Sequence, residues 1–133
     1  MPLSPVTTSF TQQPSGGAFV INAYGADYLE VNGIRQESSV LVTPMGGPES
    51  FPASVATLAA PQIQAIAERA PEIVLIGTGS RQVFLSPEIL APLHTIQVGV
   101  ECMAMGAACR TYNLLALEGR KVLALILFDH PQR

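Results

Sequence analysis

The residues that could bind a ligand or take part in a reaction are concentrated in two segments of this sequence. The first, GTGSR at 77–81, follows an apolar run at 73–76, and the second, ECMAMGAACRTYN at 101–113, follows another at 96–100. If both runs are parallel strands of one sheet, the two segments open on the same edge, where α/β proteins place their ligands. The sequence therefore predicts a cleft that brings Gly79 close to Ala107.

Twelve residues of these segments are candidates for lining the cleft: Gly77, Thr78, Gly79, Arg81, Glu101, Ala107, Ala108, Cys109, Arg110, Thr111, Tyr112 and Asn113. Arg81 suits an anionic ligand, because a guanidinium can hold a carboxylate or phosphate through two parallel hydrogen bonds. The alternative is a structural ion pair between Arg81 and Glu101. The small residues at 106–108 either offer an anion the free N–H groups of a helix start or let the helix pack tightly on the sheet.

No complete catalytic or metal-binding pattern is present, so catalytic residues stay unknown. The GTG turn lacks the third glycine and the Lys-Ser or Lys-Thr pair of nucleotide-binding loops. Cys109 lacks a residue placed to act as its base, and a buried structural thiol is the favoured interpretation. Neither His94 nor His130 has a partner at zinc-ligand spacing, so neither a metal nor a cofactor is expected.

The composition indicates one globular domain with few surface charges. Hydrophobic residues make up 48% of the 133 residues and charged residues 13%. A surface so low in charge favours association, so we expect a protein partner or a homo-oligomer. The net charge of -3 excludes nucleic-acid binding, which needs a basic surface. No signal-like start and no apolar run long enough for a transmembrane segment are present, so a cytoplasmic location is expected.

The elements that position the two segments follow from periodicity and turn residues. Residues 1–17 are expected to form a flexible tail and 18–129 a single domain. An antiparallel meander is predicted first, with Asn32-Gly33 as its hairpin turn and strands at 19–24, 28–31 and 35–42. A loop at 43–54, rich in proline and glycine, follows it. The remainder predicts a helix at 55–69, followed by strands at 73–76, 96–100 and 121–128 that alternate with helices at 87–93 and 105–117.

Four motifs stand out in this sequence, and several of them are longer than chance would give. They are VNG at 31–33, PEIVLIGTGSR at 71–81, GVECM at 99–103, and AACRTYN at 107–113 followed by EGR at 118–120. With them the chain resembles the Mth938-like family, a domain of unknown function whose mitochondrial relatives include an assembly factor for respiratory complex I. The resemblance spans about 19–127. It implies a three-layer α/β fold with a mixed sheet, an antiparallel β-meander at the N-terminal side and helices packed on the sheet.

The resemblance transfers no catalytic residues, because the family has none established. Where relatives often show Trp-Pro and Asp-Thr, this chain has Phe51-Pro52 and Ala104-Met105. The second change removes a carboxylate from the expected cleft. The leading hypothesis is a non-enzymatic protein-binding or assembly-factor-like domain. The alternative is a small-molecule or anion-binding protein or enzyme whose ligand lies between Arg81 and the helix start at 106–109.

Overall fold

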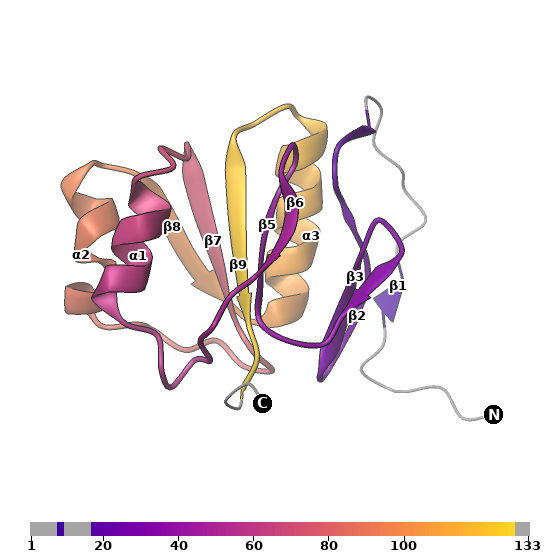
Figure 1. Cartoon of the computed structure of the whole chain (residues 1–133), viewed down its shortest axis with the longest axis horizontal. Helices are drawn as coiled ribbons and strands as arrows, with labels where there is room; N and C mark the ends of the chain where they lie inside the picture. The colour runs from indigo at the N-terminus through magenta and orange to yellow at the C-terminus, as the bar shows by residue number, and fades with distance from the viewer. Residues whose placement is uncertain (1–7, 10–16, 130–133) are drawn as a thin grey trace.

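The computed structural model describes residues 8–9 and 17–129, which form two sheets and three helices (Figure 1). In chain order the elements are β1 (Thr8–Ser9), β2 (Ile21–Gly25), β3 (Tyr28–Val31), β4 (Ile34–Gln36), β5 (Val40–Thr43), β6 (Gly47–Ser50), α1 (Ala60–Ala67), β7 (Ile73–Thr78), α2 (Pro87–Thr95), β8 (Gly99–Met103), α3 (Met105–Leu117) and β9 (Val122–Leu127). None of the helices in these residues is long and apolar enough to cross a bilayer.

The large sheet is mixed and has the strand order β6-β5-β9-β7-β8. Strand β7 runs parallel to β8 and β9, whereas β5 runs antiparallel to β9 and β6. The small sheet, β1-β2-β3-β4, is antiparallel throughout. The predicted α/β fold, with a mixed sheet and an N-terminal meander, is therefore confirmed.

Helices cover both faces of the large sheet. In Figure 1, α1 and α2 lie on one face, α3 lies on the other, and the small sheet stands beside α3. Strand β9 shows the consequence for the sequence: Val122, Ala124 and Ile126 join the core under α3, while alternate residues join the core under α1 and α2. A strand buried on both faces needs the continuous apolar run that predicted it.

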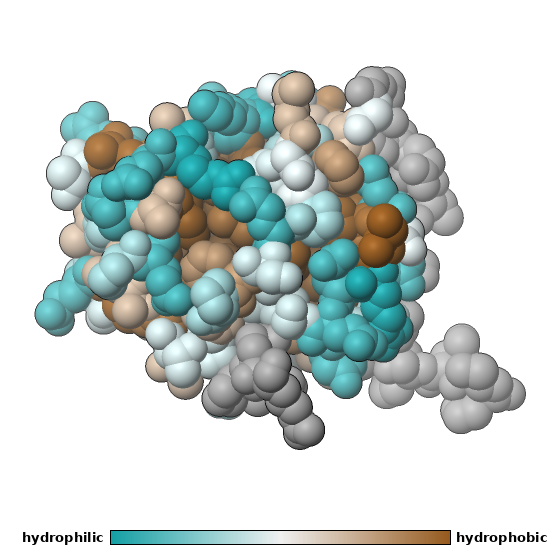
Figure 2. Space-filling model, in the orientation of Figure 1, coloured by the Kyte–Doolittle hydropathy of each residue, from teal (hydrophilic) through white to brown (hydrophobic). Residues whose placement is uncertain are grey.

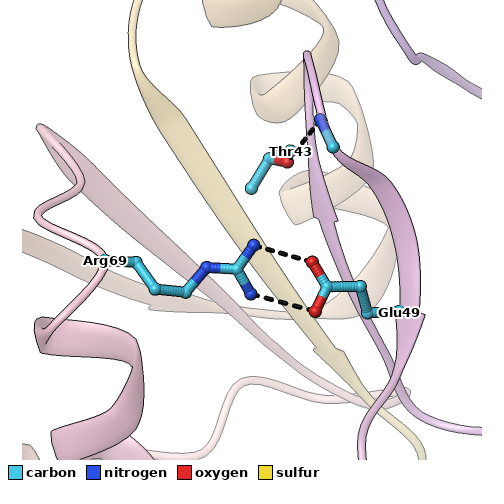
Figure 3. A network of polar contacts seen from close by, with 4 residues as sticks. Thr43, Glu49 and Arg69 are labelled. Atoms are coloured by element: carbon cyan, nitrogen blue, oxygen red, sulfur yellow. Dashed lines mark hydrogen bonds and ion pairs between the residues drawn. The ribbon is translucent and has the colours of Figure 1, made fainter.

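On the face of the large sheet that carries α1, an ion pair links the end of the helix to strand β6. Arg69, just after α1, binds Glu49 on β6 through two contacts of 3.1 and 2.7 Å, which cross in front of the sheet (Figure 3). Thr43 accepts a hydrogen bond from the Gly46 amide (3.0 Å) and so closes the β5–β6 turn. Figure 2 shows hydrophobic residues in a recess between α1 and β6 on this face, bordered by hydrophilic ones.

The Asn-Gly hairpin is confirmed, but the strand predicted after it is wrong in one respect. Asn32 and Gly33 have φ angles of 49° and 82°, as this turn requires. The predicted strand at 35–42 is two strands, β4 and β5, which belong to different sheets. The buried Ser39 lies between them; its hydroxyl accepts a hydrogen bond from the Phe128 amide (3.0 Å) and its carbonyl accepts one from the Phe51 amide (2.9 Å). These two hydrogen bonds hold Ser39 at the point where the chain leaves the small sheet and enters the large one.

Several element boundaries also differ from prediction. Helix α1 begins at Ala60 rather than at 55, because Ser54 and Thr57 form a turn in which the Ser54 amide donates to the Thr57 hydroxyl (2.8 Å). Strand β8 covers 99–103 rather than 96–100, because Gln97 has a φ of 60° and cannot continue a strand. Strand β6 lies in the segment predicted to be irregular. Most of the expected tail lies outside the described residues; Thr8 and Ser9 pair with β2, which the sequence did not predict.

Helix α3 was predicted with its observed bounds, Met105–Leu117. Gly119 follows it with a φ of 76°, the left-handed conformation typical of the residue after a helix end. Ser86 caps α2, with its hydroxyl accepting from the Ile89 amide (3.4 Å).

Candidate functional site

The ends of β7 and β8 lie side by side, with Gly77 paired to Met103. Beyond them the Met105 amide donates to the Gly79 carbonyl (2.7 Å), which joins the turn after β7 to the start of α3. Gly79 and Ala107 line one cavity of about 370 Å³, here called the junction cavity, together with Arg110. The structure thus brings together the two segments that the sequence singled out.

Thr78 is engaged within its own turn. Its side chain is 1% exposed, and its hydroxyl donates to the Arg81 carbonyl (2.7 Å) and accepts from the Val83 amide (2.9 Å). The Met103 carbonyl lies 3.3 Å from the same hydroxyl. The hydroxyl therefore shapes the loop after β7 and is occupied by backbone groups.

A carboxylate of the chain itself sits on the turn after β7. The Ser80 amide donates to both oxygens of Asp129 (3.2 and 3.4 Å), and the Ser80 hydroxyl donates to Oδ2 (2.9 Å). Gly79 has a φ of 87°, and a Cβ at this position would collide with the Asp129 carboxylate. Asp129 was not among the residues predicted from the sequence. Its position just after the last strand could have indicated this role, because β9 runs parallel to β7 and both strands end at the same edge of the sheet.

Arg81 and Glu101 form no ion pair, so this predicted contact is wrong. The ion pairs within residues 17–129 join Arg35 to Glu37, Arg69 to Glu49 and Arg120 to Glu72. Val100 and Cys102 pack into the core under α1 and α2, so Glu101 between them points to the opposite face of the sheet.

Arg81 instead lies on the α1 side of this edge. With Val83 and Asp129 it lines a second cavity of about 530 Å³, here called the loop cavity. Ser80 is common to both cavities. Arg81 and the start of α3 therefore do not face one shared space.

The polar end of the AACRTYN motif docks the small sheet onto α3. The Tyr112 hydroxyl donates to the Phe19 carbonyl (2.7 Å), and burial raises the pKa of Tyr112. The Asn113 amide group donates to the Ile21 carbonyl and accepts from the Ile21 amide, both at 2.9 Å. Arg110 donates to the Tyr24 hydroxyl (2.8 Å). Tyr112 and Asn113, predicted to line a cleft, are thus used in structural contacts.

The glycine and alanines of the motifs allow close packing. A Cβ at Gly77 would lie 3.2 Å from the Cβ of Ala108 and 3.1 Å from Ile126 Cδ1. A Cβ at Gly106 would lie 2.5 Å from the Tyr24 hydroxyl. Tight packing of α3 on the sheet, one of the two interpretations of these small residues, is therefore observed.

Cys109 is a buried thiol with no exposed surface. Desolvation by burial raises the pKa of Cys109 to about 12. Cys102 belongs to the core on the opposite face of the sheet, and both thiols are free. No group of three or more His, Cys, Asp or Glu residues in the described part of the chain could hold a metal ion.

We expect Cys109 to react with iodoacetamide at least about 100-fold more slowly in the native protein than in urea, because burial excludes the reagent and suppresses the thiolate. The measurement uses the Cys102→Ser variant at pH 7.5, so that mass spectrometry follows one thiol. The urea-unfolded variant is the control for reagent quality. Fast labelling of the folded variant would contradict the buried-thiol interpretation and favour a redox role.

The comparisons with known proteins agree with the fold described above. Residues 21–127 match a family described as protein of unknown function (DUF498/DUF598). A crystal structure from Bordetella parapertussis is 42% identical, with a TM-score of 0.80 over 87% of this chain and 100% of that chain. A solution structure from Bordetella pertussis, described as a Mth938-like domain, is 33% identical, with a TM-score of 0.77 over 94% of this chain and 95% of that one.

Two curated relatives match over shorter segments. The 13 kDa major membrane protein of Francisella tularensis subsp. holarctica is 44% identical over 57 residues, which cover 43% of this chain and 46% of the relative. The bovine NADH dehydrogenase (ubiquinone) 1 alpha subcomplex assembly factor 3 is 38% identical over 56 residues, 42% of this chain and 30% of the relative. The chain thus spans less than half the length of these relatives. Because the family match covers most of its residues and includes both junctions, this chain belongs to the DUF498/DUF598, or Mth938-like, family of proteins of unknown function.

Proposed function

We propose that this chain is a non-enzymatic protein-binding domain of the assembly-factor type. Its binding surface is the loop that follows β7, residues 79–86, here called the Phe84 loop. The partner presents an apolar socket for Phe84 and a carboxylate for Arg81. The side chains that could otherwise act in catalysis support the proposal, because they are engaged or buried within the fold: the Thr78 hydroxyl binds backbone groups, and the Cys109 thiol is buried.

The observation that carries the proposal is the exposure of the Phe84 loop. Phe84 is 82% exposed and Val83 is 36% exposed. Among the described residues the Arg81 guanidinium has no hydrogen bond or ion pair, since only its carbonyl is engaged. Phenylalanine and arginine are enriched at the centres of protein interfaces. An unpaired arginine three residues from an exposed aromatic ring is suited to such a contact.

The relatives give the proposal its direction. One of them is named an assembly factor, and the 38% identity is confined to 56 residues. Holding another protein requires an exposed surface, and the Phe84 loop provides one. The cytoplasmic location expected from the sequence remains part of the proposal.

Truncation of Phe84 should weaken partner binding measurably. We expect Phe84→Ala to weaken the partner by about 2 kcal/mol, roughly 30-fold in Kd, as for an interface hot spot. The partner is first captured on the immobilised wild-type chain from a lysate of the native host and identified by mass spectrometry. Its Kd for each purified variant is then measured by calorimetry.

The matched control is Leu114→Ala on α3, which also shortens an exposed apolar side chain (56% exposed). It should leave the Kd unchanged, while Arg81→Ala should weaken binding and leave the fold intact. A partner that binds Phe84→Ala as tightly as wild type would refute the Phe84 loop as the interface. Equal losses in Phe84→Ala and Leu114→Ala would show nonspecific capture.

A second candidate function is anion binding in the junction cavity. Arg110 is the charged residue that lines it, and the first-turn residues Gly106 and Ala107 lie beside it. First-turn N–H groups have no acceptor within their own helix and favour an anion. This arrangement replaces the expected site between Arg81 and the helix start.

Phosphate titration separates the two candidates. If the junction cavity holds an anion, inorganic phosphate should shift the amide resonances of Gly106 and Ala107 saturably, and Arg110→Gln should abolish the shift. The Gly33 amide, in the distant hairpin, serves as the internal control. Unshifted resonances at millimolar phosphate would remove this candidate and leave the protein-binding proposal.

A further inference from the structure

A larger cavity, of about 720 Å³, lies at the opposite end of the large sheet, where β7 and β9 begin. The chain just before β2, the end of β5 and the C-terminal end of α3 complete its walls. We propose that this amino-end cavity binds an anionic amphiphile, a medium-chain fatty carboxylate, with its hydrocarbon chain inside and its carboxylate at the rim.

The interior of the amino-end cavity is apolar. Ala18, Pro44 and Leu117 line it with half-buried apolar side chains, whereas Val122, at the start of β9, is 1% exposed and offers it little surface. Phe19 adds a half-buried aromatic ring to the wall. Small-molecule sites in proteins are typically apolar cavities of about 300–1,000 Å³ with few polar groups. This cavity has the size and lining of such a site.

The charged side chains that line the cavity are all cationic. They are Arg69, Arg120 and Lys121, and no acidic residue is among the lining residues. Glu49 engages both terminal nitrogens of Arg69, as Figure 3 shows, and Arg120 uses its Nε to bind Glu72.

Lys121 supplies the charge that remains available. Its ammonium group has no ion pair within residues 17–129, whereas its backbone amide contacts Glu72 (3.3 Å). Arg120 keeps its two terminal nitrogens outside the Glu72 contact. A ligand with an apolar body and one carboxylate complements both features. A neutral hydrophobe lacks the charge, and an inorganic anion lacks the apolar body.

A tryptophan at position 45 can report on the cavity, because the chain contains no tryptophan. Met45 lines the cavity and is 93% exposed, so Met45→Trp should fold normally. We expect decanoate, titrated below its micelle concentration, to change the fluorescence of this variant saturably. The matched control is Ile34→Trp, at a 65% exposed position on β4 outside the cavity, which should not respond.

The charge contact is tested by adding Lys121→Gln to the Met45→Trp chain. Decanoate binding should weaken about two- to fivefold, the range for one exposed ion pair, while decanol binding stays unchanged. The site is overturned if decanoate gives no saturable response, or if Ile34→Trp responds equally. The anionic assignment is overturned if Lys121→Gln leaves decanoate binding unchanged or weakens decanol to the same extent.

Discussion

Replacing Gly79 with alanine should destabilise the protein by about 2–5 kcal/mol. The φ of 87° at Gly79 is left-handed, which costs a residue with a Cβ about 1–2 kcal/mol. The new Cβ would also collide with the Asp129 carboxylate, and overpacking of this kind adds about 1–3 kcal/mol. Urea unfolding followed by circular dichroism measures the change in the free energy of unfolding.

Gly33→Ala separates the cost of a left-handed backbone from the cost of the collision with Asp129. Gly33 has a similar φ of 82°, and a Cβ there would meet nothing within 4 Å. This control should lose only the backbone term of about 1–2 kcal/mol. The double variant Gly79→Ala, Asp129→Gly should recover part of the larger loss. Equal losses in the two single variants would show that Asp129 does not occupy the turn in solution.

Asn113→Ala should destabilise the protein by about 2–6 kcal/mol. The change removes two hydrogen bonds to the backbone of the buried Ile21 and leaves its N–H and C=O without these partners. Each polar group left unsatisfied on burial costs about 1–3 kcal/mol. Urea unfolding gives the total loss, and hydrogen exchange at the Ile21 amide shows whether the loss is local to β2.

Two further variants, at position 113 and at position 114, serve as comparisons for the loss of stability in Asn113→Ala. Asn113→Asp keeps an acceptor for the Ile21 amide but loses the donor to the carbonyl, so it should fall between wild type and Asn113→Ala. Leu114→Ala, at the next and more exposed position, should cost much less. If Ile21 exchange is unchanged in Asn113→Ala, the small sheet is held to α3 by other contacts.

The sequence predicted those elements that depend on local patterns. The buried strands β7 and β9 follow from continuous apolar runs, and α3 follows from helical periodicity that ends before Gly119. The hairpin at Asn32-Gly33 follows from turn chemistry. These features need no information from distant parts of the chain.

Long-range contacts explain what the sequence could not predict. The break between β4 and β5 depends on Ser39 meeting Phe128, 89 positions away, and the turn after β7 depends on Ser80 meeting Asp129, 49 positions away. No local pattern encodes either pairing. The family resemblance predicted the fold through motifs such as AACRTYN, but it could not show that Tyr112 and Asn113 serve the packing of the small sheet.

The docking of Ile21 by Asn113 has a consequence for synthesis on the ribosome. Ile21, the first residue of β2, emerges 92 positions before the side chain that completes its hydrogen bonds. At about 5–20 residues per second, roughly 5–20 s pass between the synthesis of Ile21 and that of Asn113. Throughout that interval the apolar face of the small sheet has no helix to pack against, so a chaperone is most needed before α3 has been synthesised.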